Sequence, residues 1–225
     1  MKRNCSLEDI SDGTLYDSDD LVEVSCNGCK GAAGCCHGMG NSIILDPFDI
    51  YRFSTNLGNT FVELLVDKIE LNMVDGIILP NLKMNDQTEQ CAFLNQTGKC
   101  SIHASRPGIC RIFPLGRYYE NHNFKYILQL NECQNASKTK MIISNWIDTP
   151  DLEKNTQYLI DWHYLLKDAE NIVRSNMQDE SLVKQLNMYL LNSFYVTKYN
   201  AAHDFYEQFY ERFNPVGRVL KQLDK

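Results

Sequence analysis

The strongest hydrophobic pattern in the chain lies after Pro150, where apolar residues recur with helical spacing. Positions four, seven and eight residues apart are apolar there, and such positions share one face of an α-helix. We therefore expect three amphipathic helices, over residues 158–173, 182–190 and 205–213, the last ending near Pro215. The aromatic residues of the third stretch are interpreted as packing against neighbouring helices; a groove for a peptide or a cofactor is the alternative.

Two earlier helices are predicted from residues that cap helix N-termini. Asp46 precedes Pro47, and proline is favourable in the first turn because its missing N–H would have no helical partner there. Thr60 is the second candidate cap, and the apolar stripe that follows it predicts a helix over residues 61–71.

Strands are predicted where short apolar runs lie between turn residues. Residues 21–24 form one such run, and residues 77–79 follow an Asp-Gly turn and end at Pro80. Residues 124–130 alternate well enough to form a third strand, whereas residues 138–147 are ambiguous and are interpreted as a helix.

Together these elements predict an α+β fold that is rich in helices. With 225 residues, 44% of them hydrophobic, the chain can bury one good core, or a domain with an appendage. We expect an acidic N-terminal arm at residues 1–20 and a cysteine-rich, metal-binding domain at 21–145, with short β-hairpins organised around the metal site. A helical region at residues 146–225 is expected to pack on that domain.

The formal net charge of −7 argues against nucleic-acid binding, because neutralising phosphates needs a basic face and the chain has no dense run of lysine and arginine. The first residues lack the apolar stretch of a signal peptide, and no later run is long enough to span a bilayer. We therefore expect a cytoplasmic protein without a membrane partner.

Eight of the nine cysteines fall into two groups of four. Four thiolates are what a closed tetrahedral zinc site or one cubane iron–sulfur cluster takes up. A disulfide framework and buried inert thiols are the alternatives, but a cytoplasmic chain of this length does not need disulfides for stability. Zinc or iron, including an iron–sulfur cluster, is therefore the predicted ligand, and Cys5 is interpreted as a spare thiol. The first group is Cys26, Cys29, Cys35 and Cys36, and the second is Cys91, Cys100, Cys110 and Cys133.

The spacing within the first group predicts more than one metal position. Two residues separate Cys26 from Cys29, which is the usual spacing for two thiolates on one ion. Cys35 and Cys36 are adjacent, and adjacent side chains tend to point apart, so we expect them to serve different centres. This predicts either interleaved centres that draw ligands from both groups or one polynuclear cluster.

Basic side chains lie near the second group and can offset the charge of the thiolates. Four thiolates around Zn²⁺ or a [4Fe–4S]²⁺ core leave a net charge of about −2 at each site. Arg106, Arg111 and Arg117 lie around Cys110, and Arg106 and Arg111 are the leading candidates to donate to sulfur. Pairing with surface carboxylates, or binding an anionic substrate, are the alternatives. His37 and His103 are interpreted as neighbours of the thiolates rather than as ligands.

The cysteine pattern resembles that of the YkgJ-like cysteine-cluster family over residues 21–135. Its most specific part is residues 100–114, Cys-Ser-Ile-His-Ala-Ser-Arg-Pro-Gly-Ile-Cys-Arg-Ile-Phe-Pro. The chain differs from the family's Cys-x2-Cys-x3-Cys-Cys motif by two extra residues before the cysteine pair, and it has His103 where a tyrosine is common. The resemblance implies that the eight cysteines chelate zinc or iron. A related branch, the flagellin lysine N-methylases, implies an iron–sulfur cluster and S-adenosylmethionine, but no methyl-donor motif is present here.

Three functions follow as alternatives. The first is a metal- or cluster-binding protein with a redox or protein-modifying role. The second is a non-enzymatic module in which zinc stabilises the fold and the C-terminal helices bind a protein partner. The third is a protein lysine N-methylase that uses S-adenosylmethionine. Thiolates suit both zinc and iron, and the Gly-x-Ser-x-Gly, His-Glu-x-x-His and Gly-x-Gly-x-x-Gly motifs are absent, so enzyme and binding protein both remain open.

Overall fold

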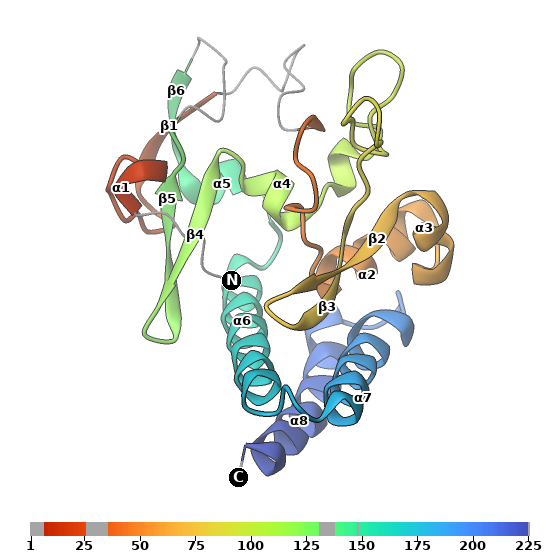
Figure 1. Cartoon of the computed structure of the whole chain (residues 1–225). Helices are drawn as coiled ribbons and strands as arrows, with labels where there is room; N and C mark the ends of the chain where they lie inside the picture. Colours follow the sequence, from red (N-terminus) through yellow and green to blue (C-terminus); the bar gives the residue numbers. More distant parts are fainter. Residues whose placement is uncertain (1–6, 26–35, 131–137, 148, 225) are drawn as a thin grey trace. The chain divides into compact units, whose positions relative to one another are not determined.

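The structure is a computed structural model that describes residues 7–25, 36–130, 138–147 and 149–224. In these ranges the fold is a mixture of helices and short antiparallel strand pairs (Figure 1). The chain folds as two compact units, each built from two separate stretches of sequence. The first unit contains residues 1–43 and 83–152, and the second contains residues 44–82 and 153–225.

Two antiparallel strand pairs and several short helices form the first unit. The strand β1 (Leu21–Ser25) pairs with β6 (Lys138–Ile142), and β4 (Leu115–Glu120) pairs with β5 (Asn123–Leu128). The helices are α1 (Leu7–Ile10), the 3₁₀ turn η2 (His103–Ser105), α4 (Gly108–Ile112) and α5 (Ile143–Ile147).

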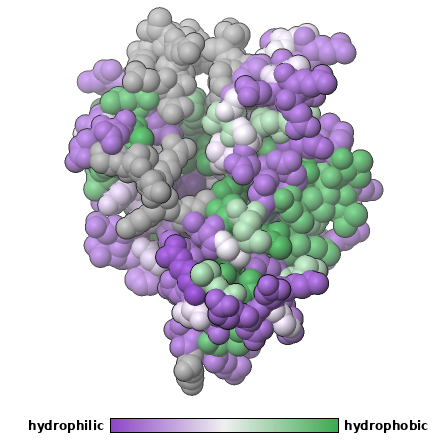
Figure 2. All heavy atoms as spheres, viewed as in Figure 1, coloured by the Kyte–Doolittle hydropathy of each residue, from purple (hydrophilic) through white to green (hydrophobic). Residues whose placement is uncertain are grey.

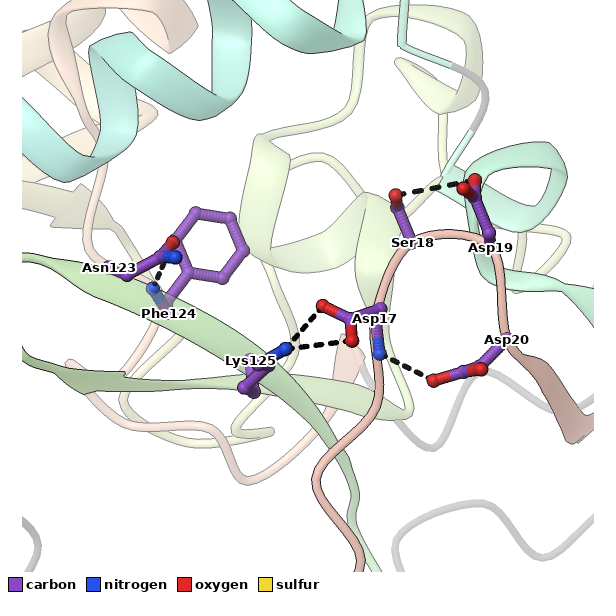
Figure 3. A network of polar contacts seen from close by, with 7 residues as sticks. All are labelled: Asp17, Ser18, Asp19, Asp20, Asn123, Phe124 and Lys125. Atoms are coloured by element: carbon purple, nitrogen blue, oxygen red, sulfur yellow. Dashed lines mark hydrogen bonds and ion pairs between the residues drawn. The ribbon is translucent and has the colours of Figure 1, made fainter.

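The segment before β1 runs along β5 rather than away from it. Tyr16 and Tyr126 exchange backbone hydrogen bonds of 2.9 Å in both directions. The Asp17 carboxylate accepts from the Lys125 ammonium at 2.6 Å and 2.7 Å, while the Asp17 N–H donates to the Asp20 carboxylate (Figure 3). Both partners of the ion pair are largely exposed, so the backbone bonds rather than this pair hold the segment in place.

The strand predictions are confirmed for β1 and β5, but the helix predicted over residues 138–147 is wrong for its first half. Only their second half is helical, as α5, and their first half is the strand β6. Leu21 lies opposite Ile142, and Val24 lies opposite Thr139. Because β6 gains its hydrogen bonds from a strand far away in the sequence, its local pattern could not reveal it.

Five α-helices, a π-helical turn and one β-hairpin form the second unit within the described residues. They are α2 (Pro47–Leu57), α3 (Phe61–Asp67), β2 (Ile69–Val74), β3 (Ile77–Leu82), α6 (Leu152–Ser175), α7 (Glu180–Leu191), the π-helical turn η3 (Asn192–Val196) and α8 (Phe205–Leu223). None of the helices in the described ranges has the length and apolar character needed to cross a bilayer.

Both predicted helix caps are confirmed, and each forms a reciprocal capping box. The Asp49 N–H donates to the Asp46 side chain at 3.0 Å, and the Asp46 N–H donates back to the Asp49 carboxylate at 3.1 Å. Thr60 and Glu63 make the equivalent pair at the start of α3. Two otherwise orphaned N–H groups are thereby satisfied at each helix start.

The helix predicted over residues 61–71 is too long. It ends at Asp67, and the strand β2 begins at Ile69. The Asp-Gly turn at residues 75–76 pairs β2 with β3. Residues 69–71, which the apolar stripe predicted to be helical, therefore belong to the hairpin. The strand β3 also continues through Pro80 to Leu82, because the Pro80 carbonyl still accepts from the Leu45 N–H at 2.8 Å.

Aromatic side chains form the core of the second unit, which confirms the packing interpretation of the C-terminal stripe. Tyr158 and Phe209 are fully buried, with ring centroids 4.7 Å apart, and Trp162 packs edge-on against Phe194 at 4.9 Å. The Tyr158 hydroxyl also accepts from the Phe48 N–H at 3.1 Å. Burial raises the pKa of Tyr158 well above its ordinary value, so the hydroxyl stays neutral.

The helix α8 does not stop near Pro215, as expected, but continues to Leu223. Proline removes one helical hydrogen bond, which ordinarily ends or kinks a helix. Val216 and Leu220 extend the buried stripe of Phe209 beyond the proline, and this packing outweighs the lost bond.

Asn187 on α7 binds the turn between β2 and β3 through two hydrogen bonds. Its Oδ1 accepts from the Ile78 N–H at 2.6 Å, and its Nδ2 donates to the Gly76 carbonyl at 3.1 Å. Asn187→Ala leaves these backbone groups unpaired, so we expect it to lower the free energy of unfolding by about 1–3 kcal/mol in urea titrations. Asn176→Ala, which removes one bond to the Ile172 carbonyl, is the control and should cost clearly less. Equal losses would contradict the role of Asn187.

Candidate metal centre

The structure describes half of the predicted ligands and both predicted arginines. Cys26, Cys29, Cys35 and Cys133, like the spare thiol Cys5, lie outside the described residues. The described candidates are Cys36, Cys91, Cys100, Cys110, Arg106, Arg111, His37 and His103, and all of them belong to the first unit.

Cys36 and Cys91 lie side by side although they belong to different cysteine groups. The Cys91 N–H donates to the Cys36 carbonyl at 2.9 Å, and the Gly38 N–H donates to the Glu89 carbonyl at 2.9 Å. Between these bonds, His37 forms an antiparallel bridge with Gln90. The chain after the first group is therefore paired, residue by residue, with the chain that leads into the second group.

A tight turn at residues 95–99 links Cys91 to Cys100. The Asn95 side chain accepts from the backbone N–H groups of Thr97 and Lys99, which closes the turn. Leu94 and Cys100 then form an antiparallel bridge, and the Ser101 N–H donates to the Phe93 carbonyl at 2.8 Å. Cys91 itself is buried, with 7% of its surface exposed. The turn thus returns Cys100 toward the segment that begins at Cys91.

Cys110 lies on α4, and two long side chains anchor that helix. Arg111 is buried, and its Nη2 donates to the Ala104 carbonyl at 3.1 Å, which joins α4 to the turn η2. At the other end, Trp146 of α5 donates from Nε1 to the Ile112 carbonyl at 3.1 Å. The position of the Cys110 backbone is therefore fixed from both sides. Trp146 was not foreseen, because its role depends on a contact between distant parts of the sequence.

His103 and Arg106 form a contact pair at the surface. The Nη1 atom of Arg106 lies 2.7 Å from Nε2 of His103. A guanidinium can only donate, so Nε2 accepts and the imidazole proton resides on Nδ1. Partial burial, followed by the charges of Arg106 and Arg111, lowers the pKa of His103. In this arrangement Nε2, the nitrogen with a free lone pair, accepts from Arg106, which favours the interpretation of His103 as a neighbour of the site rather than a ligand.

The described residues alone do not assemble a complete metal site. Among them, no group of three or more histidine, cysteine, aspartate or glutamate side chains is placed to hold a metal ion. What they do provide is a set of soft thiol donors on anchored backbone, from both cysteine groups. Thiol donors fit zinc and iron by their chemistry.

Two substitutions of Arg111 distinguish the effect of its hydrogen bond from the effect of its positive charge. Arg111→Met removes the hydrogen bond that Arg111 donates to the Ala104 carbonyl, and we expect a loss of about 1–3 kcal/mol in the free energy of unfolding. Arg111→Lys keeps a positive charge but loses the planar fork. If the charge alone matters, zinc binding measured by competition with a chromophoric chelator survives in the lysine variant; we expect both variants to bind more weakly. Arg218→Met, at an exposed position on α8 of the second unit, is the control and should bind zinc normally.

Comparison with known proteins identifies the cysteine-containing part of the chain. The family model "CxxCxxCC: Putative zinc- or iron-chelating domain" matches residues 25–140, slightly more than half of the chain. This range contains all eight grouped cysteines and both arginines. No curated protein and no solved structure matches the chain.

Proposed function

Because the chain belongs to the CxxCxxCC family of zinc- or iron-chelating domains, we propose that its first unit binds zinc or iron through thiolates of both cysteine groups. The ligands in this proposal are Cys26, Cys29, Cys35, Cys36, Cys91, Cys100, Cys110 and Cys133. A reducing compartment such as the cytoplasm would keep these thiols available to the metal.

The pairing of Cys36 with Cys91 is the observation that carries the proposal. It supports interleaved centres, since a ligand from the first group lies next to a ligand from the second through a backbone bond of 2.9 Å. The turn at Asn95 and the anchored helix α4 hold Cys100 and Cys110 in the same unit. These hydrogen bonds hold the backbone around Cys91, Cys100 and Cys110 and do not depend on a bound metal.

Arg106 and Arg111 have different parts in the proposed site. Arg111 is 8% exposed, and a buried guanidinium beside thiolates offsets part of the charge of about −2 that four such ligands leave on the metal. Arg106 contacts His103, and its guanidinium adds a positive charge beside the turn η2. When bound, the metal would supply the remaining attraction that holds the cysteines together, and it would make the first unit's stability depend on it.

The experiment that tests the proposal is purification of the full chain without oxygen, followed by metal and sulfide analysis and an absorption spectrum. We expect at least one equivalent of zinc or iron to remain bound after desalting. Iron with acid-labile sulfide and visible absorption would identify an iron–sulfur protein and favour a redox or protein-modifying role. Colourless protein with zinc would identify a module whose fold is stabilised by a structural zinc site. Folded protein without either metal, and with all its thiols reactive, would contradict metal binding.

A further inference from the structure

Met84 and Cys91 lie opposite each other at the base of a short turn in the first unit. They form an antiparallel bridge. Backbone hydrogen bonds of 2.8 Å and 2.9 Å flank the bridge, and they join Asn85 to Gln90 and Ala92 to Lys83. Because these bonds lie on either side of it, Met84 and Cys91 form a non-hydrogen-bonded pair. In such pairs the side chains of the two segments come closest together.

The sulfur atom of Met84 is within reach of the Cys91 thiol. The Cβ atoms of such a pair lie about 4.5–5.5 Å apart on the same face of the paired segments. Methionine is unbranched and has three rotatable bonds, so its thioether can turn toward the thiol. The turns at residues 85–90 and 95–99 are exposed, and the surface at the upper right of Figure 2, where Figure 1 shows them, is hydrophilic. Cys91 is buried and Met84 is half-buried, so this pair of sulfur atoms is largely sheltered from water.

Cys100 has the same backbone arrangement, but no sulfur lies opposite it. Its bridge partner is Leu94, and backbone hydrogen bonds of 2.9 Å and 2.8 Å flank this pair as well. Leu94 and Met84 are both half-buried, and leucine and methionine are close in volume. Leucine therefore satisfies the packing of such a pair, and the sulfur of Met84 is a chemical feature that the packing does not require.

We propose that Met84 is a further ligand of the metal site at Cys91, and that its thioether makes this site take a soft monovalent cation, Cu⁺. The inference rests on the proposed function, because Cys91 is one of the thiolate ligands proposed above. Zinc in proteins is bound by thiolate, imidazole and carboxylate groups, whereas thioethers combined with thiolates suit Cu⁺. The 2.9 Å bond from the Cys91 N–H to the Cys36 carbonyl brings a second cysteine to the same place.

Competition with chromophoric chelators for Cu⁺ and for Zn²⁺, on the full chain without oxygen and with a reductant, tests the proposal. Met84→Leu removes the sulfur at nearly constant volume. Loss of a group that merely supports a metal ligand costs roughly 10–100-fold in affinity, so we expect this variant to bind Cu⁺ at least about tenfold more weakly. Its affinity for Zn²⁺ should stay within about twofold, because zinc does not use the thioether. Met177→Leu is the matched control and should change neither affinity, since Met177 belongs to the second unit, which contains no cysteine.

NMR of the chain labelled with ¹³C at the methionine methyl groups tests ligation by the sulfur itself. The chain has seven methionines, and the signal missing from Met84→Leu is that of Met84. We expect this signal to shift when Cu⁺ is added and to stay in place when Zn²⁺ is added. An unmoved signal, an unchanged Cu⁺ affinity in Met84→Leu, or equal losses for both metals would overturn the role of Met84 while leaving the proposed function intact. A chain that binds neither Zn²⁺, iron nor Cu⁺ would contradict the proposed function, and this inference with it.

Discussion

Replacing Cys110 with serine should release metal from the protein, whereas replacing Cys5 should leave the metal in place. A serine hydroxyl is not ionised at neutral pH and is a poor substitute for a soft thiolate. The helix α4 holds residue 110 through the bonds of Arg111 and Trp146, so a neighbouring group cannot easily move into its position. Because loss of an outer-shell partner already costs roughly 10–100-fold in affinity, we expect a loss greater than about 100-fold here.

Metal analysis after desalting, together with competition against a chelator of known affinity, measures this difference. Cys5→Ser is the matched control, because it removes one thiol outside the range that the family model matches. Equal losses from the two substitutions would contradict the division between ligands and a spare thiol.

Cys36→Ser and Cys91→Ser, made singly and together, extend the same test to the interleaved arrangement. If both cysteines hold one centre, the double variant should lose no more metal than the single variants, since either change already disables the site. If they hold separate centres, the double variant should lose both equivalents. This non-additivity is what a shared site produces, and strictly additive losses would argue that the two neighbours serve different metals.

Local signals were sufficient to predict the helix starts and the long C-terminal helices. The Asp46 and Thr60 caps act within four residues of themselves, and the stripe from Tyr158 to Val173 belongs to one helix. Such information is present in any short window of the sequence. It is also independent of what the segment later packs against, which is why the structure retains it.

Tertiary contacts decided the elements that the sequence pattern assigned wrongly. Residues 138–142 form a strand because β1 pairs with them, and residues 69–71 leave the predicted helix because β3 does. Pro80 and Pro215 were expected to end their elements, but each lies in an element held by contacts with other parts of its unit. The local cost of a proline is a few kcal/mol at most, and it does not predict whether buried neighbours will outweigh it.

The eight candidate ligands remain a prediction from the sequence, whereas the contacts that hold the backbone of the described ones come from the fold. Spacing alone separates eight cysteines into two groups and predicts that Cys5 is a spare thiol. The contact of Cys36 with Cys91, and the roles of Arg111 and Trp146, depend on segments that meet only in the folded chain. A motif records which atoms can bind, whereas the fold decides which of them are brought together.

The two units should respond differently to removal of the metal. The aromatic core of the second unit, around Tyr158 and Phe209, is completed by its own side chains. In the first unit, isolated bridges, a turn and the short helix α4 carry the described cysteines. Binding of zinc by cysteine sites contributes on the order of 10 kcal/mol to folding. Loss of metal should therefore destabilise the first unit far more than the second.

Hydrogen exchange before and after chelation, in the presence of a thiol reductant, measures this asymmetry directly. We expect the amides of Cys91 and Ser101, which donate to Cys36 and Phe93, to lose most of their protection when the metal is removed. The amides of Phe48 and Ile78, which donate to Tyr158 and Asn187, should keep theirs to within about tenfold, because their partners lie in the aromatic unit. Uniform loss across both units would show that they unfold as one, and unchanged protection at Cys91 would show that the metal does not stabilise the first unit.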